Sequence, residues 1–240
     1  MIATCTTCSN ELTGKHCSNC GQPAELKRID GHYILHEIEH ILHFDKGILY
    51  TVKELLIQPG KSIKSFISND RSRLVKPVIF IIITSLIYTT INHFFQIEDG
   101  YISIHEVKST AITTIFGWVQ SHYGYANIII GVFIAFWIKL FFKKYDYNFF
   151  EILILLCFVI GVAMLILALF AIIQGVTKIG LMQYSGMLSF GYITWAIGQF
   201  FDRKKISSYV KALSAYLLGM LTSMITALLI GYLIDTIFKH

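Results

Sequence analysis

The chain has 240 residues, of which 55% are hydrophobic and only 15% are charged. Soluble domains carry about 25% charged residues, so this composition excludes an ordinary soluble domain for most of the chain. The formal net charge is +5, but the cations lie in segments that flank apolar runs and form no single cluster. Because counterion release needs clustered Lys and Arg, the charge distribution argues against nucleic acid as a partner.

The first predicted element is a small metal-binding head over residues 1–24. Two Cys-x-x-Cys pairs lie eight residues apart, and Gly21 follows the last cysteine. Each pair offers two sulfurs from one turn, so the two turns together supply four thiolates to one tetrahedral zinc ion. Such a site has no open coordination position, which makes it structural and not catalytic. The predicted zinc ligands are Cys5, Cys8, Cys17 and Cys20.

Residues 25–75 are predicted to form amphipathic helices that lie on the membrane surface. His36, Glu37 and His40 match the H-E-x-x-H pattern, in which two histidines bind zinc and the glutamate acts as general base. A peptidase would also need a third ligand and a dry cleft, and the sequence that follows offers no obvious ligand. An interfacial helix is therefore preferred. A second metal site and a metallopeptidase remain alternatives.

A basic segment ends this region, just before the first long apolar run. Its cations favour a cytoplasmic position and contact with anionic lipid, which contributes about 1 kcal/mol per charge near the surface. Binding of a phosphate or nucleotide ligand is the alternative. The cations are Lys61, Lys64, Arg71, Arg73 and Lys76.

Residues 76–240 are predicted to form a transmembrane helix bundle, so the chain is expected to be an all-α polytopic membrane protein. A bilayer core of about 30 Å needs roughly 20 helical residues, and five apolar runs come close to that length. No Asp, Glu, Lys or Arg falls near the middle of any run, which argues against ion-coupled transport. The predicted spans are 77–95, 126–142, 152–174, 181–201 and 210–234.

The positive charges predict how the bundle is oriented. Lys and Arg of short loops stay preferentially on the cytoplasmic side. Such residues precede the first run. They recur between the second and third runs, at Lys143 and Lys144, and between the fourth and fifth runs, at Arg203, Lys204 and Lys205. The pattern predicts a bacterial inner-membrane protein with a cytoplasmic amino terminus and an external carboxyl terminus. The cysteines would then lie in a reducing compartment, where thiolates bind metal more often than they form disulfides.

The last apolar run carries a small residue at every fourth position. Small residues allow two helices to approach closely in a membrane. Packing within the bundle is the preferred interpretation, and a homo-oligomeric seam that could form a pore is the alternative. The small residues are Ala215, Gly219, Ser223, Ala227 and Gly231.

Several short motifs follow one another along residues 5–95. They are Cys20-Gly21-Gln22, His36-Glu37, Asp45-Lys46-Gly47, Thr51, Pro59-Gly60, Arg71-Ser-Arg and Pro77. These motifs resemble an uncharacterised bacterial family that joins an amino-terminal zinc ribbon to a multi-pass membrane region. The resemblance implies this architecture without implying an activity. Small multi-pass proteins of this sort also occur as membrane partners in phage-defence loci.

Together these features favour a non-enzymatic membrane protein whose cytoplasmic zinc ribbon binds a protein partner or its own membrane-surface helices. One alternative is an oligomeric pore or a membrane effector, for example in phage defence. The other is a membrane-surface metallopeptidase that uses His36, Glu37 and His40.

Overall fold

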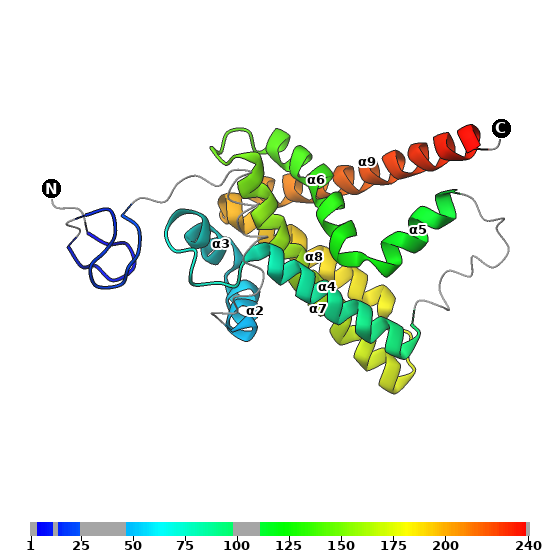
Figure 1. Cartoon of the computed structure of the whole chain (residues 1–240), viewed down its shortest axis with the longest axis horizontal. Coiled ribbons are helices and arrows are strands. Elements are labelled where there is room, and N and C mark those ends of the chain that lie inside the picture. The colour runs from blue at the N-terminus through cyan, green and yellow to red at the C-terminus, as the bar shows by residue number, and fades with distance from the viewer. Residues whose placement is uncertain (1–3, 12–13, 25–46, 98–110, 239–240) are drawn as a thin grey trace.

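The computed structural model describes residues 4–11, 14–24, 47–97 and 111–238 (Figure 1). Within these ranges the regular elements are all helices, which confirms the all-α fold class. A small head, described at residues 4–11 and 14–24, precedes the helical part. The helices are α2 (Ile48–Ile57), α3 (Pro59–Ser68), α4 (Pro77–Phe95), α5 (Ala111–Ser121), α6 (Tyr123–Phe141), α7 (Phe149–Thr177), α8 (Met182–Asp202) and α9 (Ile206–Phe238).

Four of these helices, α4, α6, α7 and α9, are long and apolar enough to cross a membrane. The predicted span 77–95 has the same bounds as α4, because Pro77 fits the first helical turn and the helix ends before Gln96. The predicted span 181–201 also forms a helix, α8, but this helix is less apolar than the other four. Polar residues and glycines dilute its sequence, so α8 does not reach the hydropathy of a membrane span by composition alone.

Helices α7 and α8 run antiparallel between the same two ends of the bundle (Figure 1). Near the start of α7, the Tyr147 ring lies 4.6 Å from that of Phe200, close to the end of α8. At the opposite end, the Gln174 Oε1 atom accepts hydrogen bonds from the backbone N–H groups of Leu181 and Met182, at 2.7 and 3.0 Å. Helix α8 therefore returns along the whole of α7, although its sequence is more polar.

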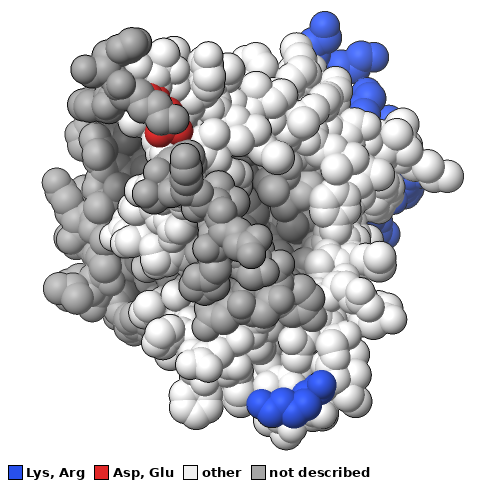
Figure 2. All heavy atoms as spheres, turned by 90° about the vertical axis from the view of Figure 1, so that its right-hand side faces the viewer, with Lys and Arg blue, Asp and Glu red and all other residues white. Residues whose placement is uncertain are grey.

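Three basic segments that are far apart in the sequence meet at one end of the bundle. Phe142, just before Lys143 and Lys144, stacks on Phe201 with ring centroids 3.9 Å apart. The Lys64 ammonium group of α3 donates a long hydrogen bond of 3.5 Å to the Phe201 carbonyl oxygen. This end also carries the turn from α8 to α9, with Arg203, Lys204 and Lys205. We call it the basic end. Figure 2 views the molecule from the side that lies opposite the head in Figure 1; there most of the described surface is uncharged, with Lys and Arg mainly at the edges.

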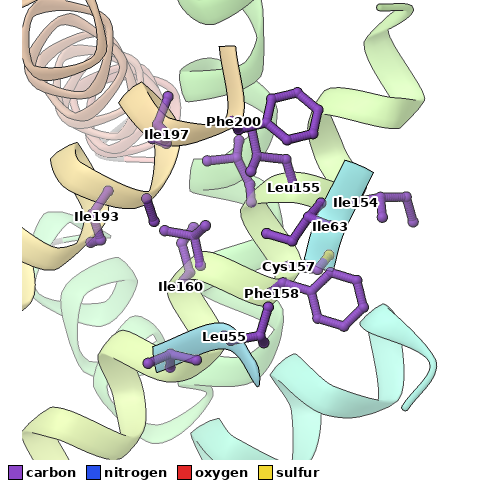
Figure 3. Close-up of a cluster of buried hydrophobic side chains, with 14 of the residues drawn as sticks. Leu55, Ile63, Ile154, Leu155, Cys157, Phe158, Ile160, Ile193, Ile197 and Phe200 are labelled. Carbon is purple, nitrogen blue, oxygen red and sulfur yellow. The ribbon is translucent and has the colours of Figure 1, made fainter. Parts of the chain in front are cut away.

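Helices α2 and α3 belong to the core of the basic end. Leu55 and Ile63 are fully buried among residues of α7 and α8 (Figure 3), and the Tyr192 hydroxyl donates to the Leu55 carbonyl oxygen at 3.1 Å. The Phe66 ring meets that of Phe158 edge to face at 5.2 Å. The other side of α2 remains apolar and exposed, at Leu49, Leu56 and Ile57. Helices α2 and α3 are the described helices of the predicted surface region, residues 25–75. They are anchored in the bundle on one side.

Candidate metal centre

The four cysteines of the head converge on one point. Their sulfur atoms all lie within 4.8 Å of one another. The Sγ atoms of Cys5 and Cys20 are 3.6 Å apart, and those of Cys8 and Cys17 are 3.5 Å apart. A tetrahedral zinc ion with Zn–S bonds of about 2.3 Å separates its sulfurs by about 3.8 Å. The cluster therefore fits, and could hold, a metal ion such as zinc.

Two backbone turns of the same design bring the cysteines together. In the first turn, the N–H of Cys5 donates to the Asn10 carbonyl at 2.8 Å, and the N–H of Ser9 donates to the Cys5 carbonyl at 2.9 Å. The second turn repeats both bonds, from Cys17 N–H to the Gln22 carbonyl at 2.7 Å and from Gly21 N–H to the Cys17 carbonyl at 2.9 Å. Each turn closes on itself, so each Cys-x-x-Cys pair presents both sulfurs on one side.

Backbone amides favour the thiolate form of the first cysteine in each pair. The N–H groups of Cys20 and Asn19 point at the Cys17 sulfur and lower the pKa of this thiol to about 6. The pKa of Cys5 is lowered in the same way. For Cys20, the Gln22 N–H acts in the same direction, but burial and the neighbouring cysteine sulfurs outweigh it and raise the pKa to about 12. Four clustered thiolates repel one another, and a divalent cation at their centre would relieve that repulsion.

The head also contacts the basic end of the bundle. The side-chain amide of Gln22, which follows the second cysteine turn, donates a 2.7 Å hydrogen bond to the Asn69 carbonyl oxygen at the end of α3. This carbonyl is one of the unpaired acceptors that every helix leaves at its carboxyl end. The contact joins two segments that the sequence analysis had treated as separate domains.

The other predicted site residues have different outcomes. His36, Glu37 and His40 lie outside the described residues, so a second metal site and the metallopeptidase remain predictions. Among the cations of the basic segment, Arg73 donates to the Tyr50 hydroxyl at 2.8 Å and forms an ion pair with Glu54 at 3.4 Å. Arg73 therefore joins the loop before α4 to α2.

The small-residue face of α9 contacts helices of the same chain. A side chain on Gly219 would collide with the backbone and side chain of Ile134 in α6, and one on Gly231 would collide with Ile112 in α5. The Asp235 carboxylate also accepts a 2.8 Å hydrogen bond from the Ala111 N–H at the start of α5. These contacts are the close helix packing that the small residues predicted. The homo-oligomeric seam remains a prediction.

Comparison with known proteins adds one finding. Residues 45–89 match the model of a family described as a protein of unknown function, DUF3667. The DUF3667 match covers α2, α3 and most of α4, and the four cysteines lie outside it. No curated protein and no solved structure matches the chain. The predicted resemblance to an uncharacterised family is therefore confirmed for residues 45–89, and the match assigns no activity.

Proposed function

We propose that this chain is a non-enzymatic protein of the bacterial inner membrane whose head binds one structural zinc ion on the cytoplasmic side. The head is held against the protein's own basic end, where it regulates or anchors a cytoplasmic protein partner. The observation that carries the proposal is the hydrogen bond from Gln22, beside the zinc ligands, to Asn69 at the end of α3.

The convergence of basic segments supports the proposed orientation. Lys64, the loop after Phe142 and the turn after Phe201 are far apart in sequence and come together at one end. Lys and Arg in short loops are retained in the cytoplasm, so this end is the cytoplasmic one. Since α8 runs back along α7, we propose that it is the fifth crossing, shielded on one side by its neighbours. An odd number of crossings places the carboxyl terminus outside.

Zinc accounts for the order of a head that has little else to stabilise it. Only two of its residues, Cys5 and Cys17, are buried apolar side chains within the described part of the head. A structural zinc ion contributes about 10–16 kcal/mol of binding free energy that acts as folding free energy. A closed four-sulfur site also leaves no position for substrate, which supports a role in docking.

The test compares the wild type with a Cys17→Ser/Cys20→Ser variant in mild detergent. Metal analysis should give one zinc per chain for the wild type and none for the variant. Hydrogen–deuterium exchange should become faster at residues 69–72 in the variant, because the hydrogen bond from Gln22 to the Asn69 carbonyl oxygen is lost. The matched control is Cys157→Ser, which removes a buried thiol of α7 outside the cluster and should keep both the zinc and the slow exchange.

Two results would contradict the proposal. Wild-type protein without bound metal would remove the structural zinc. A zinc-free variant with unchanged exchange at residues 69–72 would show that the head does not dock on α3.

The orientation has its own test, since alkaline phosphatase fused to the carboxyl terminus should be active outside the cytoplasm. A fluorescent protein that matures at this position would place the terminus inside.

A further inference from the structure

A groove at the basic end lies outside the metal centre, and it shares only Asn69, the acceptor of the Gln22 hydrogen bond, with the proposed docking contact. It has a volume of about 590 Å³ and runs between α3 and the end of α8. One wall is the exposed side of α3, and the other is the turn that leads into α9. The residues that line it and bear on the argument are Lys61, Lys64, Ser65, Gln199, Arg203 and Lys204.

The two walls are fixed against each other by a glycine. A Cβ atom on Gly60, in the first turn of α3, would lie 2.5 Å from the carbonyl carbon and oxygen of Gln199. Only a residue without a side chain permits this approach. Below the groove, Ile63 and Phe66 anchor α3 in the core and are nearly or fully buried. The groove is therefore a feature of the packed core and does not depend on the position of exposed side chains alone.

The charges of the groove are unbalanced. Four cations line it, and Asp202 is the one carboxylate among its lining residues. Asp202 is already engaged, since it pairs with Lys205 at 2.9 Å and accepts from the Lys204 backbone N–H at 3.0 Å. Within the part of the chain that the structure describes, none of the four lining cations forms an ion pair. Four cations around one carboxylate leave a net positive charge in the groove, and a bound anion would compensate it.

Lys64 is half-buried, whereas the other three lining cations are exposed. Its ammonium group is 5.8 Å from the centroid of the Phe200 ring and donates only a long hydrogen bond, to the Phe201 carbonyl. Burial lowers the pKa of Lys64, and the charge of Asp202 offsets this in part. A lysine in this position would gain from an anionic acceptor, because charge-assisted hydrogen bonds are about twice as strong as neutral ones.

We propose that this groove binds a phosphate group, carried either by an anionic phospholipid or by a soluble phosphate ester. Lys64 and Arg203 approach the phosphate from opposite walls, with Lys61 and Lys204 next to them, and the Ser65 hydroxyl and the Gln199 amide offer neutral donors. Phosphate presents several strong acceptor oxygens, which suits a mixture of lysine, guanidinium and hydroxyl donors. The groove also lies at the end of the bundle where lipid phosphates would surround it.

The test uses three probes on the full-length protein in an uncharged detergent. Native mass spectrometry follows the titration of dioctanoyl phosphatidylglycerol, inorganic phosphate and dioctanoylglycerol, which lacks a phosphate. We expect one phosphatidylglycerol per chain and no comparable binding of dioctanoylglycerol. In a Lys64→Gln/Arg203→Gln variant the apparent Kd should rise at least about tenfold, since two charge-assisted hydrogen bonds are lost.

The matched control removes the same charge elsewhere at the basic end. Lys143 and Lys144 are exposed on the turn between α6 and α7 and do not line the groove. A Lys143→Gln/Lys144→Gln variant should therefore change the apparent Kd less than about twofold. The conservative variant Lys64→Arg should retain binding, and circular dichroism of each variant should match that of the wild type. If Lys64→Gln/Arg203→Gln does not fold, Arg203→Gln alone, an exposed position, serves in its place.

Each outcome decides the proposal. Inorganic phosphate that binds alone or displaces phosphatidylglycerol supports it and assigns the groove to soluble phosphate esters. Binding of phosphatidylglycerol without competition by phosphate supports it and assigns the groove to lipid. Three results would each overturn it. Dioctanoylglycerol could bind as tightly as phosphatidylglycerol, the apparent Kd could rise equally in the groove and control variants, or neither phosphate probe could bind.

Discussion

Ser9 and Gly21 occupy equivalent positions in the two cysteine turns, and both have left-handed backbones, with φ of 59° and 72°. Each donates its N–H to the carbonyl of the first cysteine of its turn. Glycine adopts this conformation readily, whereas other residues pay about 1–2 kcal/mol. The two halves of the head therefore have the same fold, and the first half is the more strained.

This difference predicts opposite effects of two substitutions. Ser9→Gly should relieve strain and tighten zinc binding by up to about tenfold, which corresponds to about 1.4 kcal/mol. Gly21→Ala should weaken zinc binding by a similar factor. Competition with a chromogenic chelator measures both affinities. Because no other heavy atom lies within 4 Å of a Cβ at Gly21, a large effect there must come from the backbone. Unchanged zinc affinity in both variants would mean that the turns tolerate either residue.

The close approach of α3 to α8 predicts a second effect. Gly60→Ala would place a methyl group 2.5 Å from the Gln199 carbonyl, so α3 would have to move away from α8. Overpacking of this kind costs about 1–3 kcal/mol, and the melting temperature in detergent should fall. Gly191→Ala is the control in the same bundle, since nothing lies within 4 Å of its added Cβ. It should leave the melting temperature unchanged or raise it slightly, because alanine favours helix. Equal melting temperatures for the two variants would contradict the packing argument.

Gln174 predicts a third effect, at the end of the bundle opposite the basic end. Its side-chain oxygen accepts from the backbone N–H groups of Leu181, the N-cap of α8, and of Met182, the first residue of α8. Gln174→Leu leaves these donors without that acceptor and should lower stability by about 1 kcal/mol, as the loss of a helix cap does. Gln174→Glu keeps the acceptor and adds negative charge near a helix amino terminus, so it should retain stability. Thermal unfolding in detergent checks both.

The control for this prediction is Gln183→Leu. Gln183 is exposed in the first turn of α8, so its replacement should change the melting temperature little. A loss of stability in Gln183→Leu as large as that in Gln174→Leu would indicate a general effect of added apolar surface. It would not support a capping role.

Much of this fold follows from sequence because the deciding interactions are local. The span 77–95 is set by an apolar run between Pro77 and Gln96. The cysteine cluster is set by two short turns, each closed by its own backbone hydrogen bonds. The left-handed position after the second pair was visible as Gly21, whereas its equivalent at Ser9 was not, because serine gives no such signal.

The positions of α2, α3 and α8 could not be predicted in the same way. Leu55 and Ile63 show that these helices have an apolar side, but the sequence does not say whether lipid or protein covers it. In the structure α7 and α8 cover both residues. The groove could not be predicted as a whole for a related reason. The basic segment with Lys64 had phosphate binding as an alternative, but Arg203 was interpreted only as a topology signal. Only the packing of α3 on α8 brings the two residues together, 139 residues apart in sequence.

The small-residue face of α9 gives the last prediction. Gly219 contacts Ile134 of α6 so closely that Gly219→Leu cannot be accommodated without separating the two helices. The substitution should therefore lower the melting temperature of the monomer, by overpacking of about 1–3 kcal/mol or more. Gly186→Leu is the control, since a Cβ at Gly186 meets no heavy atom within 4 Å. Chemical cross-linking in native membranes measures self-association in parallel. A variant Gly219→Leu that keeps its melting temperature but loses cross-linked dimers would instead assign this face to a homo-oligomeric seam, since in that case Gly219 would be meeting a second copy of the chain.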